Sequence, residues 1–251
     1  MISINDITVK REILYSLAPF SEGVKALKRR SDLIDFAFSD LRLYGSVLTK
    51  SGTELIVGGD TVSDIPVFEH RLCKAHHKLL ARFEDKLEME LEIDSIVLNE
   101  FCTILSGTDQ PPYRKGSLLI YHLDLVPGDD ESISADLTDM FSSIKRDERN
   151  GAFNEPPFGD FCLKAAEVHN GIIKAYPYAD GFTELAARAA MQYVLIKAGF
   201  FPVDIGISET EYNTITAAGI KADDASELSN VIRSAIYKKL QYLIDSIERG
   251  V

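Results

Sequence analysis

A short loop has the sequence Tyr176-Pro177-Tyr178-Ala179-Asp180-Gly181, and segments with a helical pattern flank it on both sides. The preceding segment, 160–175, is the most apolar one in the chain. The following segment begins near Thr183, a residue type suited to a helix N-cap, and ends before Gly199. A loop that leads into a helix start directs free N–H groups at an anion. The stretch therefore predicts a helix–loop–helix unit of the kind that handles phosphates.

Helical periodicity extends outward from this unit. We predict further helices over residues 22–40, 67–91, 93–105, 132–146, 208–218 and 226–248. Glycines between residues 45 and 59 indicate turns and short extended pieces. Partial alternation from Ser117 to Val126, ahead of Pro127-Gly128, gives the clearest strand or hairpin pattern. Together these patterns predict one mostly helical domain.

The composition limits the classes of function. The chain has 251 residues, of which 45% are hydrophobic, enough for a core without a metal or disulfide. Its formal net charge of −12 would repel a phosphate backbone, so we expect no nucleic-acid partner. No apolar run has the length of a membrane span, and the N-terminus does not resemble a signal peptide. Three separated cysteines, Cys73, Cys102 and Cys162, are typical of reduced thiols, which favours a cytoplasmic protein.

Several segments resemble the Fic family in the order in which that family has them. Tyr176 to Glu184 lies where the family has its motif H-P-F-x-D/E-G-N-G-R, and His169 lies seven residues before the first motif position. The other similar segments are Leu48-Thr49 to His77, Pro112-Tyr113-Arg114, Leu118 to Leu125, Ala198 to Val203 and Glu211-Tyr212. The resemblance implies an all-α Fic fold with a small β-hairpin flap at Leu118–Leu125. It also implies an N-terminal helical segment over residues 1–45 and a Fic-like domain over residues 46–251.

The resemblance further implies a chemistry. Fic enzymes transfer the AMP part of ATP to a protein hydroxyl, with Mg²⁺ held by the motif acid. Carried onto this sequence, the catalytic positions are Tyr176 and Glu184, and the metal position is Asp180. The cofactor-binding positions are Asp180, Gly181, Phe182 and Thr183. The flap edge would pair with an extended segment of a protein partner, and the family often forms homodimers.

Four motif positions depart from the family pattern. Tyr176 replaces the histidine that acts as the general base, and a phenol with a pKa of about 10 accepts a proton poorly. Phe182 replaces the asparagine and is bulky where backbone must approach phosphate, and Thr183 replaces the second glycine and cannot cheaply adopt a positive φ. Glu184 replaces the arginine, and a carboxylate about 5 Å from a phosphate charge costs on the order of 3 kcal/mol at an effective dielectric of about 20. We therefore expect no AMP transfer by the family's mechanism, and neither ATP nor Mg²⁺ is a firm cofactor.

The motif residues that follow the family pattern are mainly structural. We expect Tyr178 to plug the loop into the core. Asp180 alone remains for Mg²⁺, and one carboxylate without phosphate oxygens is a poor site. The family's inhibitory segment, S/T-x-x-x-E-G/N, would align with Asp40 and Tyr44, so its glutamate and the arginine that it pairs with are both absent.

Other polar side chains have simpler interpretations. His70, Cys73 and His77 share one helix face, but because no fourth ligand lies nearby, a helix surface with a buried thiol is favoured over a metal site. The apolar surroundings of His169 favour a hydrogen-bonded core histidine over a catalytic one. The basic cluster Lys25–Arg30 is expected to be a solvated helix face. Tyr176 and Phe182 either line a pocket that stacks a base or sugar, or pack into the core.

Two functions are consistent with these patterns. The first is a binding or regulatory module that keeps the Fic scaffold, the flap and a remodelled pocket. The second is an enzyme with altered transferase chemistry on a protein hydroxyl, using a nucleotidyl or glycosyl donor, which divergent Fic-fold effectors of plant pathogens resemble. In that case Asp180, Tyr176 and Glu184 would face the substrate, with Glu184 as the base. Residual AMP transfer ranks below both.

Overall fold

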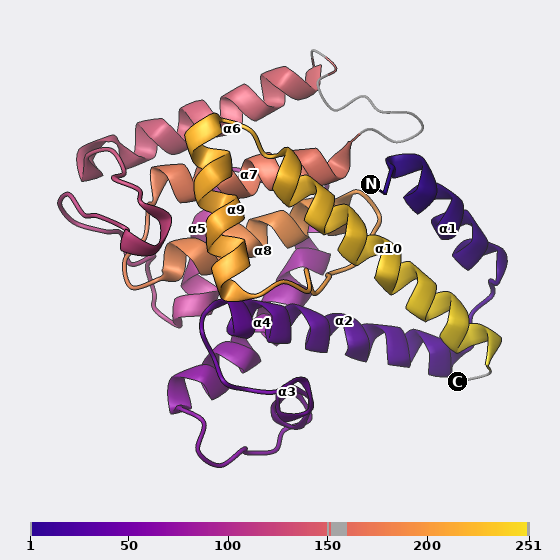
Figure 1. The fold of residues 1–251 in the computed structure, drawn as a ribbon. Helices are drawn as coiled ribbons and strands as arrows, with labels where there is room; N and C mark the ends of the chain where they lie inside the picture. The colour runs from indigo at the N-terminus through magenta and orange to yellow at the C-terminus, as the bar shows by residue number, and fades with distance from the viewer. Residues whose placement is uncertain (1, 150, 152–159, 250–251) are drawn as a thin grey trace.

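The computed structural model describes residues 2–149, 151 and 160–249, and Figure 1 shows the course of the chain. These residues form ten α-helices and two short 3-10 helices. The α-helices are α1 (Ile4–Ser16), α2 (Glu22–Leu43), α3 (Lys50–Val57), α4 (Val67–Glu88), α5 (Ser95–Ser106), α6 (Ile133–Arg149), α7 (Phe161–Ala175), α8 (Phe182–Lys197), α9 (Glu209–Ala222) and α10 (Ser226–Glu248). The 3-10 helices are η1 (Tyr121–Leu123) and η2 (Asp130–Ser132). The predicted all-α class is thus confirmed for the described residues.

Polar residues start most of the helices. Six N-cap side chains accept a hydrogen bond from a backbone N–H of the first helical turn, as unsatisfied helix starts require. They are Ser3, Ser21, Thr49, Asp94, Asp160 and Ser208. The predicted N-cap at Thr183 is wrong, because α8 already begins at Phe182, and Gly181 precedes it with a φ of 77°. The expected turns after residue 45 contain one further helix, α3, for which Thr49 is the cap.

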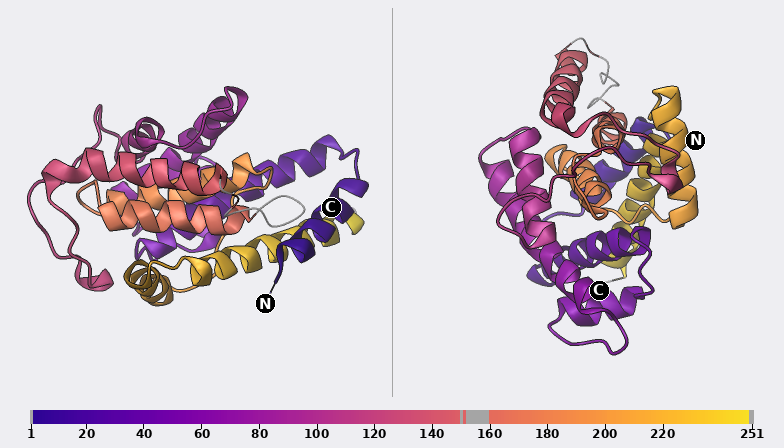
Figure 2. Two further views of the ribbon diagram at one scale, coloured as in Figure 1. Left: turned by 90° about the horizontal axis from the view of Figure 1, so that it is seen from above. Right: turned by 90° about the vertical axis from the view of Figure 1, so that its left-hand side faces the viewer.

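Helices α7 and α8 form the centre of the molecule (Figures 1 and 2), and they pack against each other along most of their length. Alanines make this close approach possible, because a small side chain lets two helix backbones come together. The alanines of these two helices that are 0% exposed are Ala165, Ala166, Ala186, Ala187, Ala189 and Ala190. Helix α5 packs on α8, α6 packs on α7, and α10 packs on both α7 and α1. The loop between α7 and α8 is therefore held by the most buried pair of helices in the described structure.

The segment Leu118–Leu125 lies between α5 and α6 and takes the place of the predicted flap. The structure does not show a two-stranded hairpin there: one antiparallel bridge joins Ile120 to Leu125, and η1 lies between them. Asp124, which ends η1, has a φ of 47°, so the chain turns back toward Leu125 directly after the 3-10 helix. Ile120 and Leu123 are buried, which anchors the segment against the helices. None of the helices in the described ranges is both long enough and apolar enough to cross a membrane.

Candidate functional site

The motif loop has an unusual backbone with three left-handed residues. Tyr176, Asp180 and Gly181 have φ values of 43°, 54° and 77°. Thr183 holds the loop closed, because its hydroxyl accepts a 2.8 Å hydrogen bond from the N–H of Tyr178 and donates one of 2.9 Å to the carbonyl of the same residue. The N–H of Phe182 donates to the carbonyl of Ala179, so it does not face an anion. Hydrogen bonds among residues 178–183 therefore hold the loop in this conformation.

Tyr178 lies in the core, as the sequence predicts. Its side chain is fully buried, and its hydroxyl donates a 2.6 Å hydrogen bond to Oδ1 of Asn99 on α5. The N–H of Arg114 donates to the carbonyl of Pro177, and the Arg114 guanidinium donates to the carbonyl of Tyr176 at 2.7 Å. These contacts fix the motif loop to the segment before the flap.

Glu184 is the central residue of the site. It lies in the first turn of α8, and its side chain is only 11% exposed. One carboxylate oxygen, Oε1, accepts a 2.7 Å hydrogen bond from the hydroxyl of Tyr176 and lies 3.2 Å from Nε2 of His122 on η1. The other oxygen, Oε2, is buried and has no hydrogen-bond partner among the described residues. The position where the resemblance places a phosphate-binding arginine thus holds a buried anion.

Tyr176 is poorly suited to act as a base here. Burial, followed by the carboxylate of Glu184, raises the pKa of its phenol far above the ordinary value of a tyrosine. The phenol stays protonated and donates a hydrogen bond to Glu184. The two residues named as catalytic positions are thus joined to each other, and the structure brings His122 to the same carboxylate.

Tyr44 covers the turn that would cradle a phosphate. It ends α2, and its ring lies so close to Gly181 that an added Cβ there would be 2.9 Å from Cε2 of Tyr44. Its hydroxyl donates a 3.4 Å hydrogen bond to the carbonyl of Asp180. The ring of Phe68 lies between those of Tyr44 and Phe182, at centroid distances of 5.7 Å and 6.4 Å. Aromatic side chains therefore pack around the turn at Gly181.

The residues present do not fit Mg²⁺-ATP. Asp180 is the one exposed carboxylate of the loop, and no group of three or more possible metal ligands occurs among the described residues. The nearest arginine along α8, Arg188, is 3% exposed and pairs through Nε with Oδ1 of Asp40. The arginine of α8 is thus buried and already paired.

Asp40 joins α2 to α4 and α8. Its second oxygen lies 2.7 Å from Nε2 of His76, whose Nδ1 lies 2.8 Å from the carbonyl of Leu72. Burial opposes the charge of Asp40, but the guanidinium of Arg188 and the ring of His76 outweigh burial and hold the pKa of this carboxyl below its usual value. The contacts of Asp40 with Arg188 and His76 thus fix the C-terminal end of α2, which Tyr44 follows.

His169 is a hydrogen-bonded core histidine, as predicted. It is fully buried, its Nε2 lies 2.5 Å from the hydroxyl of Tyr212, and its Nδ1 lies 2.9 Å from Oδ1 of Asn170. Burial lowers the pKa of His169 to about 4, so the ring is neutral at pH 7. The guanidinium of Arg188 lies 5.6 Å from the ring centroid of Tyr212, which links this group to Asp40.

The face with His70, Cys73 and His77 is a helix surface with a buried thiol. Nε2 of His70 accepts from the N–H of Val62 at 3.2 Å, and burial raises the pKa of Cys73 to about 11. The cations of the Lys25–Arg30 cluster are paired with carboxylates of the chain. These pairs are Lys25–Glu22, Lys28–Asp32, Arg29–Glu84 and Arg30–Glu54.

Sequence reasoning missed two residues of this region, His122 and His76. His122 lies in a segment predicted as strand, and alternation gives no indication that its side chain reaches Glu184. His76 is next to His77, the residue that ends one of the Fic-like segments. Only the place of His76 on the apolar face of α4, beside Leu72 and Leu79, indicates its burial.

Neither a protein-family model nor a curated protein sequence matches the chain. Solved structures do match it in fold. A Fic domain containing signaling protein from Bacteroides thetaiotaomicron superimposes with a TM-score of 0.77 at 18% identity, over 98% of this chain and 99% of that one. Residues 134–508 of Fic-1 from C. elegans match with a TM-score of 0.73 at 15% identity, over 98% and 73% of the two chains. A Fic family protein from Desulfovibrio desulfuricans matches with a TM-score of 0.68 at 15% identity, over 99% and 75%.

These matches cover nearly the whole chain in one continuous arrangement. The described chain therefore has the Fic fold, as the sequence predicts.

Proposed function

We propose that this protein is a divergent member of the Fic family that acts as a binding or regulatory module and not as an AMP transferase. The proposal rests on the position and contacts of Glu184. Its buried carboxylate occupies the position of the family's phosphate-binding arginine and is engaged by Tyr176 at 2.7 Å. A phosphate brought to this helix start would meet an anion in a region of low dielectric, where repulsion is strong.

Tyr44 supports the same proposal. Its ring fills the space above Gly181, and this space would have to open before any anion reached the backbone of the loop. Because α2 is anchored by the buried Asp40–Arg188 pair, displacing Tyr44 would disturb more than one side chain.

A protein partner at the flap is part of the proposal. Two large apolar side chains of the segment Leu118–Leu125 face solvent, Leu119 at 41% and Tyr121 at 85% exposure. Exposed aromatic and aliphatic side chains on one short segment are typical of a contact surface. We also propose that an edge of the flap pairs with an extended segment of the protein partner. Formation of a homodimer is a further proposal.

An enzyme with altered transferase chemistry is the second candidate, and His122 is the observation that favours it. Its imidazole is about half exposed and lies 3.2 Å from Glu184, an arrangement in which a carboxylate orients a histidine base.

A thermal-shift panel separates the candidates. The purified protein is heated with ATP, other nucleoside triphosphates, CDP-choline and sugar nucleotides, each with and without Mg²⁺. A ligand at about 100 times its Kd adds about 2.7 kcal/mol of stability. We expect no shift with any donor. A sugar-nucleotide shift that is lost in His122→Gln would favour the second candidate, and a Mg²⁺-ATP shift with label transfer that disappears in Asp180→Ala would overturn the proposal.

A further inference from the structure

One cavity of the described structure lies away from the motif loop. It has a volume of about 480 Å³, within the range of small-molecule sites, and none of its lining residues belongs to the loop 176–184. Four segments form it: α2, α3, α10 and the connection between α8 and α9. The proposed function does not involve this cavity.

The floor of the cavity is apolar. Ile34, Ile205 and Ala235 line it and are at most 8% exposed, and Leu27 lies beside them. Tyr242 forms one edge, with 55% of its side chain open to solvent. A hydrophobic or aromatic body of a ligand would therefore find apolar contacts on the floor and a ring at the edge.

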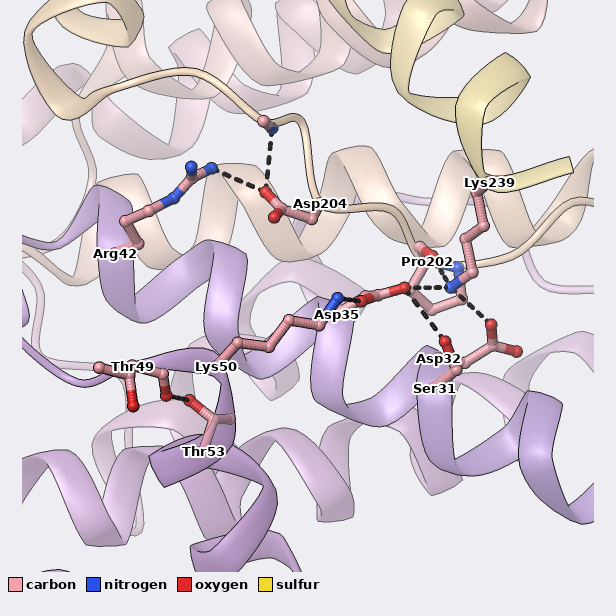
Figure 3. Close-up of polar contacts among 11 residues, drawn as sticks. Ser31, Asp32, Asp35, Arg42, Thr49, Lys50, Thr53, Pro202, Asp204 and Lys239 are labelled. Atoms are coloured by element: carbon pink, nitrogen blue, oxygen red, sulfur yellow. Dashed lines mark hydrogen bonds and ion pairs between the residues drawn. The ribbon is translucent and has the colours of Figure 1, made fainter. Parts of the chain in front are cut away.

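A buried polar cluster forms one wall, and Figure 3 shows it. The ammonium nitrogen of Lys239 lies 2.7 Å from Oδ1 of Asp32, 2.9 Å from Oδ2 of Asp35 and 2.7 Å from the carbonyl of Pro202. Lys50 reaches the other oxygen of Asp35 at 2.5 Å, from the opposite side in Figure 3. Burial alone would raise the pKa of Asp35, but the two ammonium groups outweigh burial and lower it. The negative charge of Asp35 is therefore already balanced by two ammonium groups.

Four cations, Arg30, Lys50, Lys238 and Lys239, and three carboxylates, Asp35, Glu54 and Asp204, line the cavity. The other two lining carboxylates are also paired, Glu54 with Arg30 at 2.9 Å and Asp204 with Arg42 at 2.7 Å. Arg30 and Lys50 are 59% and 56% exposed, so their remaining donors are accessible from solvent. Lys238 also lines the mouth, is exposed, and has no ion pair within the described part of the chain. The chain has a net charge of −12, yet the exposed hydrogen-bond donors of this cavity belong to cationic side chains.

We propose that this cavity binds a small amphipathic anion. The anionic group, a carboxylate or another oxyanion, would lie at the mouth between Arg30, Lys50 and Lys238. The apolar body would lie on Ile34, Ile205 and Ala235. Arginine and lysine at the rim of an apolar cavity give such a ligand both orientation and specificity.

A fluorescence titration with two matched probes tests this. Dansylglycine carries a carboxylate on an apolar ring system, and dansylamide is its neutral counterpart. We expect saturable binding of dansylglycine and at least about tenfold weaker binding of dansylamide, a difference of about 1.4 kcal/mol. Arg30→Glu/Lys238→Glu should weaken dansylglycine by about tenfold or more, because both exposed cations are reversed. Lys145→Glu/Lys221→Glu changes the net charge equally at exposed positions on α6 and α9 and should leave binding unchanged.

Three outcomes would overturn the proposal. They are the absence of saturable dansylglycine binding, equal affinity for the neutral probe, and equal weakening by the two double variants. Unchanged unfolding midpoints of both variants show that the comparison concerns binding and not folding. The test is independent of the motif site, so it can fail while the proposed function stands.

Discussion

The hydroxyl of Tyr176 donates a 2.7 Å hydrogen bond to Oε1 of Glu184, so the first and last residues of the motif bind each other. Both residues are buried. In the family pattern these positions hold a base and a cation, which would both face a nucleotide. Here a phenol and a carboxylate satisfy one another, and the helix start is closed by groups of the chain itself.

Removing this bond should destabilise the protein. Tyr176→Phe leaves a buried carboxylate without its closest donor, and a hydrogen bond to a charged group contributes about 1.5–3 kcal/mol. We expect a loss of this size in the free energy of unfolding, measured by urea denaturation. His122→Gln removes a half-exposed partner of the same oxygen, so its loss should stay below about 1 kcal/mol. A larger loss for His122→Gln than for Tyr176→Phe would contradict the assignment of Tyr176 as the principal partner.

Gly181 should resist substitution for two separable reasons. Its φ of 77° is strained for any residue with a Cβ, and the new atom would lie 2.9 Å from Tyr44. Gly107→Ala is the matched control, because Gly107 has a φ of 69° and open space around it. We expect Gly107→Ala to cost about 1 kcal/mol and Gly181→Ala clearly more. The excess should disappear in a Tyr44→Ala background, and its persistence there would show that Tyr44 is not the neighbour responsible.

The buried pair between Asp40 and Arg188 should be strongly stabilising relative to a broken pair. Asp40→Ala leaves Arg188, at 3% exposure, as an unpaired buried charge, and we expect a loss of about 3–5 kcal/mol in the free energy of unfolding. The surface pair Glu22–Lys25 is the control, with side chains 89% and 58% exposed, and Glu22→Gln should change stability by less than about 0.5 kcal/mol. Similar losses in the two variants would be evidence against a dry, buried Asp40.

Stability should fall in mild acid because of His169. Its pKa is lowered from 6.5 to about 4 in the folded state, so the unfolded chain binds more protons between these values. The contribution is complete above pH 6.5 and is lost as the pH falls toward 4, with a total of about 3 kcal/mol. Urea denaturation at several pH values should show this slope in the wild type and in His77→Gln, and a shallower one in His169→Gln. An identical slope in all three proteins would count against the account.

The sequence predicted the helices around the motif because their periodicity is strong and their capping residues are explicit. It failed for α3, where glycines suggested turns, since Thr49 caps a helix that accommodates Gly52 beneath Leu48. It overstated the flap, because a partly alternating pattern does not distinguish a two-stranded ladder from a single bridge around a 3-10 turn.

The site was predictable as a set of positions but not as a set of contacts. The replacement of the arginine by Glu184 is visible in the sequence, whereas its partners are not. Tyr176 is eight residues away along the chain, and His122 is 62 residues away. Tyr44 and Gly181 are joined only by the packing of α2 against the motif loop. Contacts of this kind depend on tertiary structure and leave no local pattern.

Titration calorimetry with Mg²⁺-ATP tests the central claim most directly. The claim is that the carboxylate of Glu184, closed in by Tyr176 and Tyr44, excludes a triphosphate from the motif loop. We predict no saturable heat with wild-type protein at ATP concentrations up to about 1 mM. A Kd of about 1 mM would correspond to a binding free energy of about −4.1 kcal/mol. Saturable binding of Mg²⁺-ATP by the wild type, weakened by Asp180→Ala, would contradict the claim.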